Sequence, residues 1–302
     1  MITDQTDQQQ DATAEDRRIV IRSERAEKMF DSGDGVRDID LSIPEGSIFG
    51  FIGPSGSGKT TIVRMFTGVV LPTDGSVTVL GAIPSEFDSV TRSRLGYMPQ
   101  LSVLYPDLSV EQNLRFLASL HGEAVRDEAL HDILAFVELD GHESKRVKEI
   151  SGGMQRRLSL AAALAHQPDL LFLDEPTAGI DPVLRRKFWD HFTELKEQGR
   201  TLFITTQYVG EAAYCDYVGV LADGRLLTVE TPDGLRRTAF GGDLIDIEFT
   251  ARPDQRLLDE LVSETGATEM TRTSPVSARL VVEEAAITLP SLGGWLSDRG
   301  ID

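Results

Sequence analysis

Gly53-Pro54-Ser55-Gly56-Ser57-Gly58-Lys59-Thr60 is the stretch that decides the fold of this chain. It fits the pattern G-x-x-x-x-G-K-[ST], in which a glycine-rich backbone presents N–H groups to phosphate and the lysine reaches the β- and γ-phosphates. An apolar run at residues 47–52 precedes it, and we expect a helix from Lys59 toward Gly68 after it. The sequence therefore predicts a phosphate-binding loop at a helix N-terminus, where the helix dipole favours an anion. The predicted nucleotide contacts continue to Thr61.

Two acids follow a second apolar strand, Leu170-Leu171-Phe172-Leu173-Asp174-Glu175. A strand that is apolar on both faces is typical of the centre of a parallel sheet. The pattern places Asp174 near Mg²⁺, together with the hydroxyl of Thr60, and it places Glu175 where it can orient and polarise an attacking water. Pro176 comes next, so the alternative is that both acids only cap the next element. The phosphate loop upstream favours the catalytic interpretation.

A third stretch, Ser151-Gly152-Gly153-Met154-Gln155, lies between the first two. Its two glycines permit close approach of the backbone, its serine can donate to phosphate, and a helix that begins there directs its positive end at the same anion. The alternative is an ordinary helix cap, because serine is a common residue at that position. Its place directly before the acidic strand favours a second grip on a nucleotide.

The composition excludes several classes of function. The chain has 302 residues and a formal net charge of −19, which repels phosphate backbones, so we expect no nucleic-acid partner. It has no run of about 20 apolar residues to cross a bilayer, and no basic and apolar N-terminal signal. The single cysteine, Cys215, excludes an internal disulfide framework and is typical of a reducing compartment.

The pattern predicts three regions along the chain. Residues 1–17 are polar and are expected to form a disordered acidic tail. From residue 18 to 240 strands and helices alternate, which predicts a mostly parallel α/β sheet with a helical insert at about residues 101–165. Residues 243–302 predict a small α+β domain. Its expected elements are strands at residues 244–249 and 279–282 and helices at residues 255–262 and 291–296, the last weakened by two glycines.

With these stretches in this order, the chain resembles the nucleotide-binding subunits of ATP-binding-cassette (ABC) transporters over about residues 18–237. The resemblance implies the ABC form of the P-loop NTPase fold, with an antiparallel β part beside the parallel sheet. It also implies ATP and Mg²⁺ as ligands. Phe30 would then stack on adenine, and Gln100 would touch Mg²⁺ and report to the membrane subunit.

The resemblance further implies a dimer of two ATP-binding subunits, either identical or different. The signature residues Ser151 to Gln155 would contact the ATP held by the phosphate loop of the opposite subunit. The loop that contains Gly179 and Asp181 would cross the dimer interface. The resemblance also implies a separate integral-membrane permease as a partner. This chain would bind it at the cytoplasmic face of the cell membrane.

The chain departs from the family pattern at two positions. Met154 stands where the signature most often has Gln, and Gln207 stands where the family commonly has His at the γ-phosphate. A Gln amide donates and accepts hydrogen bonds but gains no proton near neutral pH. Catalysis is therefore assigned chiefly to Glu175, with Gln207 positioning the phosphate.

With Gln at position 207, the chain resembles a branch of exporters for drugs, antibiotics or lipids. Residues 287–301 resemble part of the small regulatory domain of that branch, without the further strand that such domains often carry. We expect an ATPase that energises export of a drug, an antibiotic or another small hydrophobic ligand. The alternatives are lipid or polysaccharide export, a soluble ABC ATPase without a transport role, and a non-hydrolysing, ATP-gated regulatory module.

Overall fold

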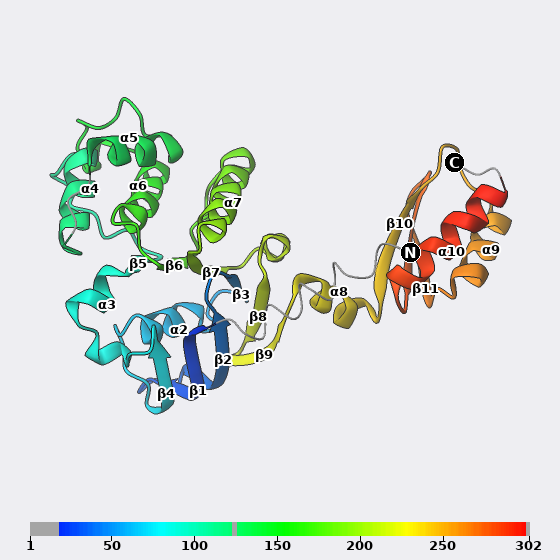
Figure 1. The fold of residues 1–302 in the computed structure, drawn as a ribbon, viewed down its shortest axis with the longest axis horizontal. Helices are drawn as coiled ribbons and strands as arrows, with labels where there is room; N and C mark the ends of the chain where they lie inside the picture. Colours follow the sequence, from blue (N-terminus) through cyan, green and yellow to red (C-terminus); the bar gives the residue numbers. More distant parts are fainter. Residues whose placement is uncertain (1–17, 123–125, 300–302) are drawn as a thin grey trace. The chain divides into compact units, whose positions relative to one another are not determined.

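The computed structural model describes residues 18–122 and 126–299, which form two compact units that divide between Val229 and Glu230 (Figure 1). The expected tail at residues 1–17 lies outside the described residues. The sequence pattern put the second region after Gly242, whereas the division by contacts comes before helix α8 (Pro232–Phe240). That helix packs against strand β10 (Asp243–Glu248) of the second unit.

The first unit contains a nine-stranded sheet with the order β4-β1-β2-β9-β8-β3-β7-β6-β5. Strands β3, β5, β6, β7 and β8 pair in parallel, and β1 pairs antiparallel with β2 and β4, so the predicted mostly parallel sheet with an antiparallel part is confirmed. The strands are β1 (Ile19–Met29), β2 (Gly35–Pro44), β3 (Ile48–Ile52), β4 (Asp74–Val79), β5 (Leu95–Met98), β6 (Leu170–Asp174), β7 (Thr201–Thr206), β8 (Tyr217–Ala222) and β9 (Arg225–Glu230).

Every residue of β3, β6 and β7 is buried, which explains why the centre of each strand is apolar. Phe49 of β3 stacks on Phe203 of β7 with ring centroids 5.6 Å apart, and Phe172 of β6 lies 5.8 Å from the same ring. Burial of each such ring contributes about 1.5–3 kcal/mol. Because the three strands are parallel, this aromatic core holds their carboxyl ends at one edge of the sheet.

Some helices of this unit pack on the sheet, and others form the predicted helical insert. Helix α2 follows β3 directly, and α7 lies between β6 and β7 in the sequence (Figure 1). The insert contains α4, α5 and α6, and α4 begins with a capping box formed by Ser109 and Gln112. The helices are α2 (Lys59–Phe66), α3 (Ser89–Ser93), α4 (Val110–Ser119), α5 (Asp127–Phe136), α6 (Gly152–Leu164) and α7 (Pro182–Glu197), with short 3-10 turns η1 (Pro84–Glu86), η2 (Val147–Glu149) and η3 (Val209–Tyr214).

The second unit is a three-stranded antiparallel sheet with the order β10-β12-β11 and two further helices. These elements are α9 (Gln255–Thr265), β11 (Glu269–Ser274), β12 (Ser277–Val282) and α10 (Ala285–Asp298). The sequence predicted only a short last helix, but α10 runs through Pro290 and two glycines. Leu292 and Trp295 are buried in the core of this unit, so tertiary packing outweighs the low helix propensity.

Candidate active site

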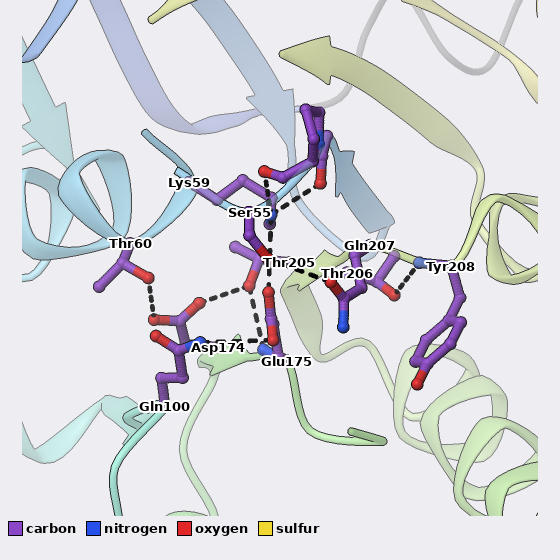
Figure 2. Close-up of polar contacts among 12 residues, drawn as sticks. Ser55, Lys59, Thr60, Gln100, Asp174, Glu175, Thr205, Thr206, Gln207 and Tyr208 are labelled. Atoms are coloured by element: carbon purple, nitrogen blue, oxygen red, sulfur yellow. Dashed lines mark hydrogen bonds and ion pairs between the residues drawn. The ribbon is translucent and has the colours of Figure 1, made fainter. Parts of the chain in front are cut away.

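The phosphate loop connects β3 to α2, as the sequence predicts, and its lysine is buried (Figure 2). Lys59 Nζ donates hydrogen bonds to the carbonyl oxygens of Gly53 at 2.7 Å and Pro54 at 3.0 Å. Gly58 has φ of +106°, and a Cβ there would lie 2.3 Å from Val36 Cγ1. The loop conformation therefore requires glycine at this position, and it wraps the backbone around the lysine.

Asp174 ends β6 and is completely buried. Its Oδ2 accepts a 2.8 Å hydrogen bond from the hydroxyl of Thr60, and its Oδ1 accepts one from the hydroxyl of Thr205 on β7 (Figure 2). A hydroxyl, a carboxylate and the amide oxygen of nearby Gln100 are the hard oxygen donors that Mg²⁺ prefers. The donor set predicted from the sequence therefore fits the metal.

Glu175 lies between the phosphate loop and Gln100. Its Oε1 is 3.5 Å from Lys59 Nζ, and its Oε2 accepts a 3.4 Å hydrogen bond from the Gln100 amide (Figure 2). The Glu175 backbone has φ of +54°, a left-handed conformation that is uncommon outside glycine, and its N–H donates to Thr205 Oγ1 at 3.0 Å. Residues held in such conformations cluster at functional sites, because the surrounding structure must enforce them.

Gln207 follows β7, and its Oε1 accepts a 3.2 Å hydrogen bond from the hydroxyl of Ser55 in the phosphate loop (Figure 2). Phe30 follows β1 and is 41% exposed, and Lys28 Nζ lies 5.7 Å from the centroid of its ring. Lys28, two residues before it, pairs with Val36, whose side chain lies against Gly58. The structure thus brings Gln207 to the loop, and strand pairing places the segment before Phe30 beside Val36.

The signature residues are arranged differently. Ser151 caps α6 by accepting a 3.2 Å hydrogen bond from Met154 N, and Ser151, Gly152 and Gly153 are all exposed. In the part of the chain that the structure describes, a Cβ on either glycine would have no heavy atom within 4 Å outside its own helix turn. Gln155 faces inward instead, because its amide donates to the carbonyl oxygens of Val147 and Ile150.

The predicted interface loop is also exposed at Gly179, which has φ of +74° and open space around it. Asp181 caps α7 by accepting hydrogen bonds from Val183 N and Leu184 N. The side-chain oxygen of Asp181 therefore has a local structural role, whereas Gly179 shapes the exposed turn before it.

Arg156 and Thr205 belong to this site but were not predicted. Arg156 donates to the backbone carbonyl oxygens of Gln100, Asp174 and Glu175, and burial lowers the pKa of its guanidinium. Arg156 therefore fixes the backbone of the residues that would hold the metal and the water. The only signal in the sequence was its place one residue after the signature, and the hydroxyls of β7 read as ordinary strand residues.

Comparison with known proteins connects this geometry to a family. The family model described as "ABC transporter" matches residues 36–178. A "Nod factor export ATP-binding protein I" from Cupriavidus pinatubonensis is 36% identical over 231 residues, which cover 76% of this chain and 71% of that protein. This chain belongs to the ABC transporter family. The resemblance predicted from its motifs is confirmed.

Two further matches define the extent of the ABC cassette. The "Probable multidrug ABC transporter ATP-binding protein YbhF" of Escherichia coli is 39% identical over 219 residues, and the match covers 72% of this chain but only 38% of YbhF. This chain therefore spans well under half of that relative. An ATP-binding cassette solved as a dimer in a post-hydrolysis state with ADP and Pi is 25% identical, with a TM-score of 0.65, and the match covers 71% of this chain and 99% of that cassette. The predicted ABC ATPase fold is confirmed.

Proposed function

We propose that this ABC cassette hydrolyses ATP to energise export through a separate membrane permease. The observation that carries the proposal is the position of Glu175, whose carboxylate lies between Lys59 of the phosphate loop and Gln100 at 3.5 Å and 3.4 Å. A carboxylate beside a phosphate-binding lysine is the arrangement that activates water for phosphoryl transfer.

The residues divide the reaction among them. Thr60, Asp174 and Gln100 would hold Mg²⁺, which would supply positive charge to the phosphates. Glu175 orients the water and accepts its proton as the water oxygen bonds to the γ-phosphorus and the bond from phosphorus to the β–γ bridging oxygen breaks. Gln207, held against Ser55, positions the γ-phosphate without donating a proton to it.

A second cassette completes the site. Gly152 and Gly153 are exposed, and no described residue outside their own helix turn lies within 4 Å of a Cβ built there, which leaves the N-terminus of α6 open to an anion. We assign Ser151 to Met154 to the ATP held by the opposite cassette, and the exposed turn at Gly179 to the interface. The dimeric cassette with ADP and Pi supports this assembly.

We assign the binding of the permease to the apolar surface beside Gln100. Leu101, Val103 and Leu120 are between 63% and 80% exposed, next to a hollow lined in part by Leu104 and Leu117. Among the described residues, no helix of the structure is long and apolar enough to cross a membrane. The surface would attach the cassette to the cytoplasmic side of a separate membrane subunit.

Export of a small hydrophobic ligand is the transport function that we favour, and the name of the multidrug relative supports it. Lipid or polysaccharide export is the second candidate. A relative named for Nod factor export, 71% of whose length matches this chain, also supports an export role. A non-hydrolysing regulatory module is disfavoured by the intact Glu175 between Lys59 and Gln100.

Phosphate release by the purified full chain tests the proposal. Glu175→Gln should lower turnover at least about 100-fold, because loss of a general base removes a 10²–10⁴-fold contribution. ATP affinity should be retained, and an ATP-bound dimer should accumulate in gel filtration. Glu197→Gln, at an exposed position on α7, is the matched control and should leave turnover unchanged. Unchanged turnover in Glu175→Gln would refute the assignment.

A further inference from the structure

A buried carboxylate outside the site described above lies in η3, four residues after Gln207. Glu211 is 3% exposed. Its Oε1 accepts a 2.7 Å hydrogen bond from the hydroxyl of Thr177, and its Oε2 accepts one of 2.5 Å from the hydroxyl of Thr206. Arg185 Nε lies 3.7 Å from Oε1. An ionised carboxylate is costly to bury, and these partners on both oxygens offset that cost.

The three partners belong to three different segments around the proposed nucleotide site. Thr177 comes two residues after Glu175, and Ala178 N donates back to the Glu175 carbonyl at 3.1 Å. Thr206 comes directly before Gln207, and its hydroxyl also accepts a 3.0 Å hydrogen bond from Tyr208 N (Figure 2).

Arg185 belongs to the first turns of α7, just after the exposed turn at Gly179. Its Nη2 donates to the Ile180 carbonyl at 3.2 Å, and its guanidinium lies over the Tyr208 ring at 4.5 Å. The cation therefore joins the interface turn to the segment after Gln207. With the two hydroxyls, it makes Glu211 the shared partner of all three segments.

A role in folding alone does not explain why the cluster is polar. Thr177 and Thr206 are both 1% exposed, and at such sites a well-packed apolar residue satisfies the core at least as well as a buried ionic group. The body of β7 follows that rule with buried Leu202, Phe203 and Ile204. Within β7, polar side chains gather toward the carboxyl end, beside Glu175 and Gln207.

We infer that Glu211 is a positioning residue for ATP hydrolysis, because its single carboxylate fixes together the segments that carry Glu175, Gln207 and the interface turn. This inference rests on the proposed function. Movement of the interface turn, for example when a second cassette docks, would be transmitted through Arg185 and Glu211 to the chain beside Gln207.

Glu211→Gln in the full chain tests the inference. The variant keeps the size of the side chain but removes the charge, so one threonine hydroxyl must reverse its hydrogen bond. We expect kcat to fall about 10- to 100-fold, since misplacement of a catalytic group by about 1 Å costs up to 10²-fold. The Kd for ATP, measured by calorimetry, should change less than about 3-fold, because the phosphate loop is untouched.

A second variant and a control separate positioning from folding. Thr177→Val should also lower kcat, and the double variant should be no slower than Glu211→Gln alone, since both changes break one network. Ser47→Ala removes a buried hydroxyl that donates to the Pro44 carbonyl at the opposite end of β3. It should lower Tm without lowering kcat per ATP-binding site.

Three outcomes would overturn the inference. Wild-type kcat in Glu211→Gln, while Glu175→Gln abolishes turnover, would refute the positioning role and leave the proposed function intact. A decrease in kcat that only follows the loss of ATP-binding sites would show that Glu211 acts in folding alone. Absence of ATP-dependent phosphate release by the wild-type chain would refute both proposals.

Discussion

The phosphate loop and the signature stretch are both glycine-rich helix starts, yet their surroundings differ. Neighbouring atoms crowd the first, whereas the second is open. A Cβ on Gly53 or Gly58 would collide with neighbouring atoms at 2.3 Å, and Lys59 is buried with its ammonium bonded inward. Gly152 and Gly153 are exposed in open space, at the start of an ordinary helix. The first loop is built by its own fold, whereas the second presents an exposed surface, which our proposal assigns to the ATP of the opposite cassette.

The largest expected effect tests the loop that the fold builds. Lys59→Ala should raise the Kd for ATP about 10- to 100-fold in calorimetry, because a charge-assisted hydrogen bond to phosphate contributes about 1.5–3 kcal/mol. Lys148→Ala, whose lysine pairs with exposed Asp107, is the control and should bind ATP normally. Unchanged affinity in Lys59→Ala would remove the lysine from the phosphate site.

A pair of glycine substitutions tests the contrast directly. Gly58→Ala should destabilise the fold by at least about 1–2 kcal/mol, because alanine is strained at φ of +106° and its Cβ meets Val36. Gly152→Ala should leave Tm unchanged or raise it slightly, because alanine favours helices. It should nevertheless reduce ATP-dependent dimerisation in gel filtration and turnover. A Gly152→Ala protein with normal dimerisation and turnover would contradict the assignment of this exposed surface to the ATP of the opposite cassette.

Gln207→Ala should have a smaller effect on turnover than Glu175→Gln, about 10-fold or less, because the amide positions phosphate through a single exposed contact with Ser55. Phosphate release measured on both variants under the same conditions gives the order. If Gln207→Ala were the slower of the two, the amide would have to take a direct part in the chemistry.

The smallest effect concerns the far end of the signature helix. His166 follows α6, stacks on His121 at 3.8 Å, and bonds the Leu95 carbonyl through Nε2. Burial lowers its pKa to about 4 from the ordinary 6.5, so the unfolded chain takes up this proton first as the pH falls. Stability should therefore decline between pH 6.5 and 4. His166→Gln should show a smaller loss of Tm over that range; an equal loss would place the dependence elsewhere.

Much of the site could be predicted because its groups lie within short, patterned stretches. Lys59 and Thr60 follow a glycine loop, and Asp174 and Glu175 end an apolar strand, so each prediction needed only local spacing. The clusters around Arg156 and Glu211 could not be predicted, because a buried arginine or glutamate on a helix has no distinctive local pattern. The inward amide of Gln155 was missed for the same reason.

The sequence by itself determined the family, the order of the motifs and the residues to which we assign phosphate and metal binding. Only the tertiary structure decided which of these residues meet. Ser55 contacts Gln207 and Thr60 contacts Asp174 because β3, β6 and β7 lie parallel and end at one edge of the sheet. Only the tertiary structure, too, distinguished a crowded glycine from an open one. Such contacts join residues more than a hundred positions apart, and the register of a parallel sheet, set by core packing, decides them.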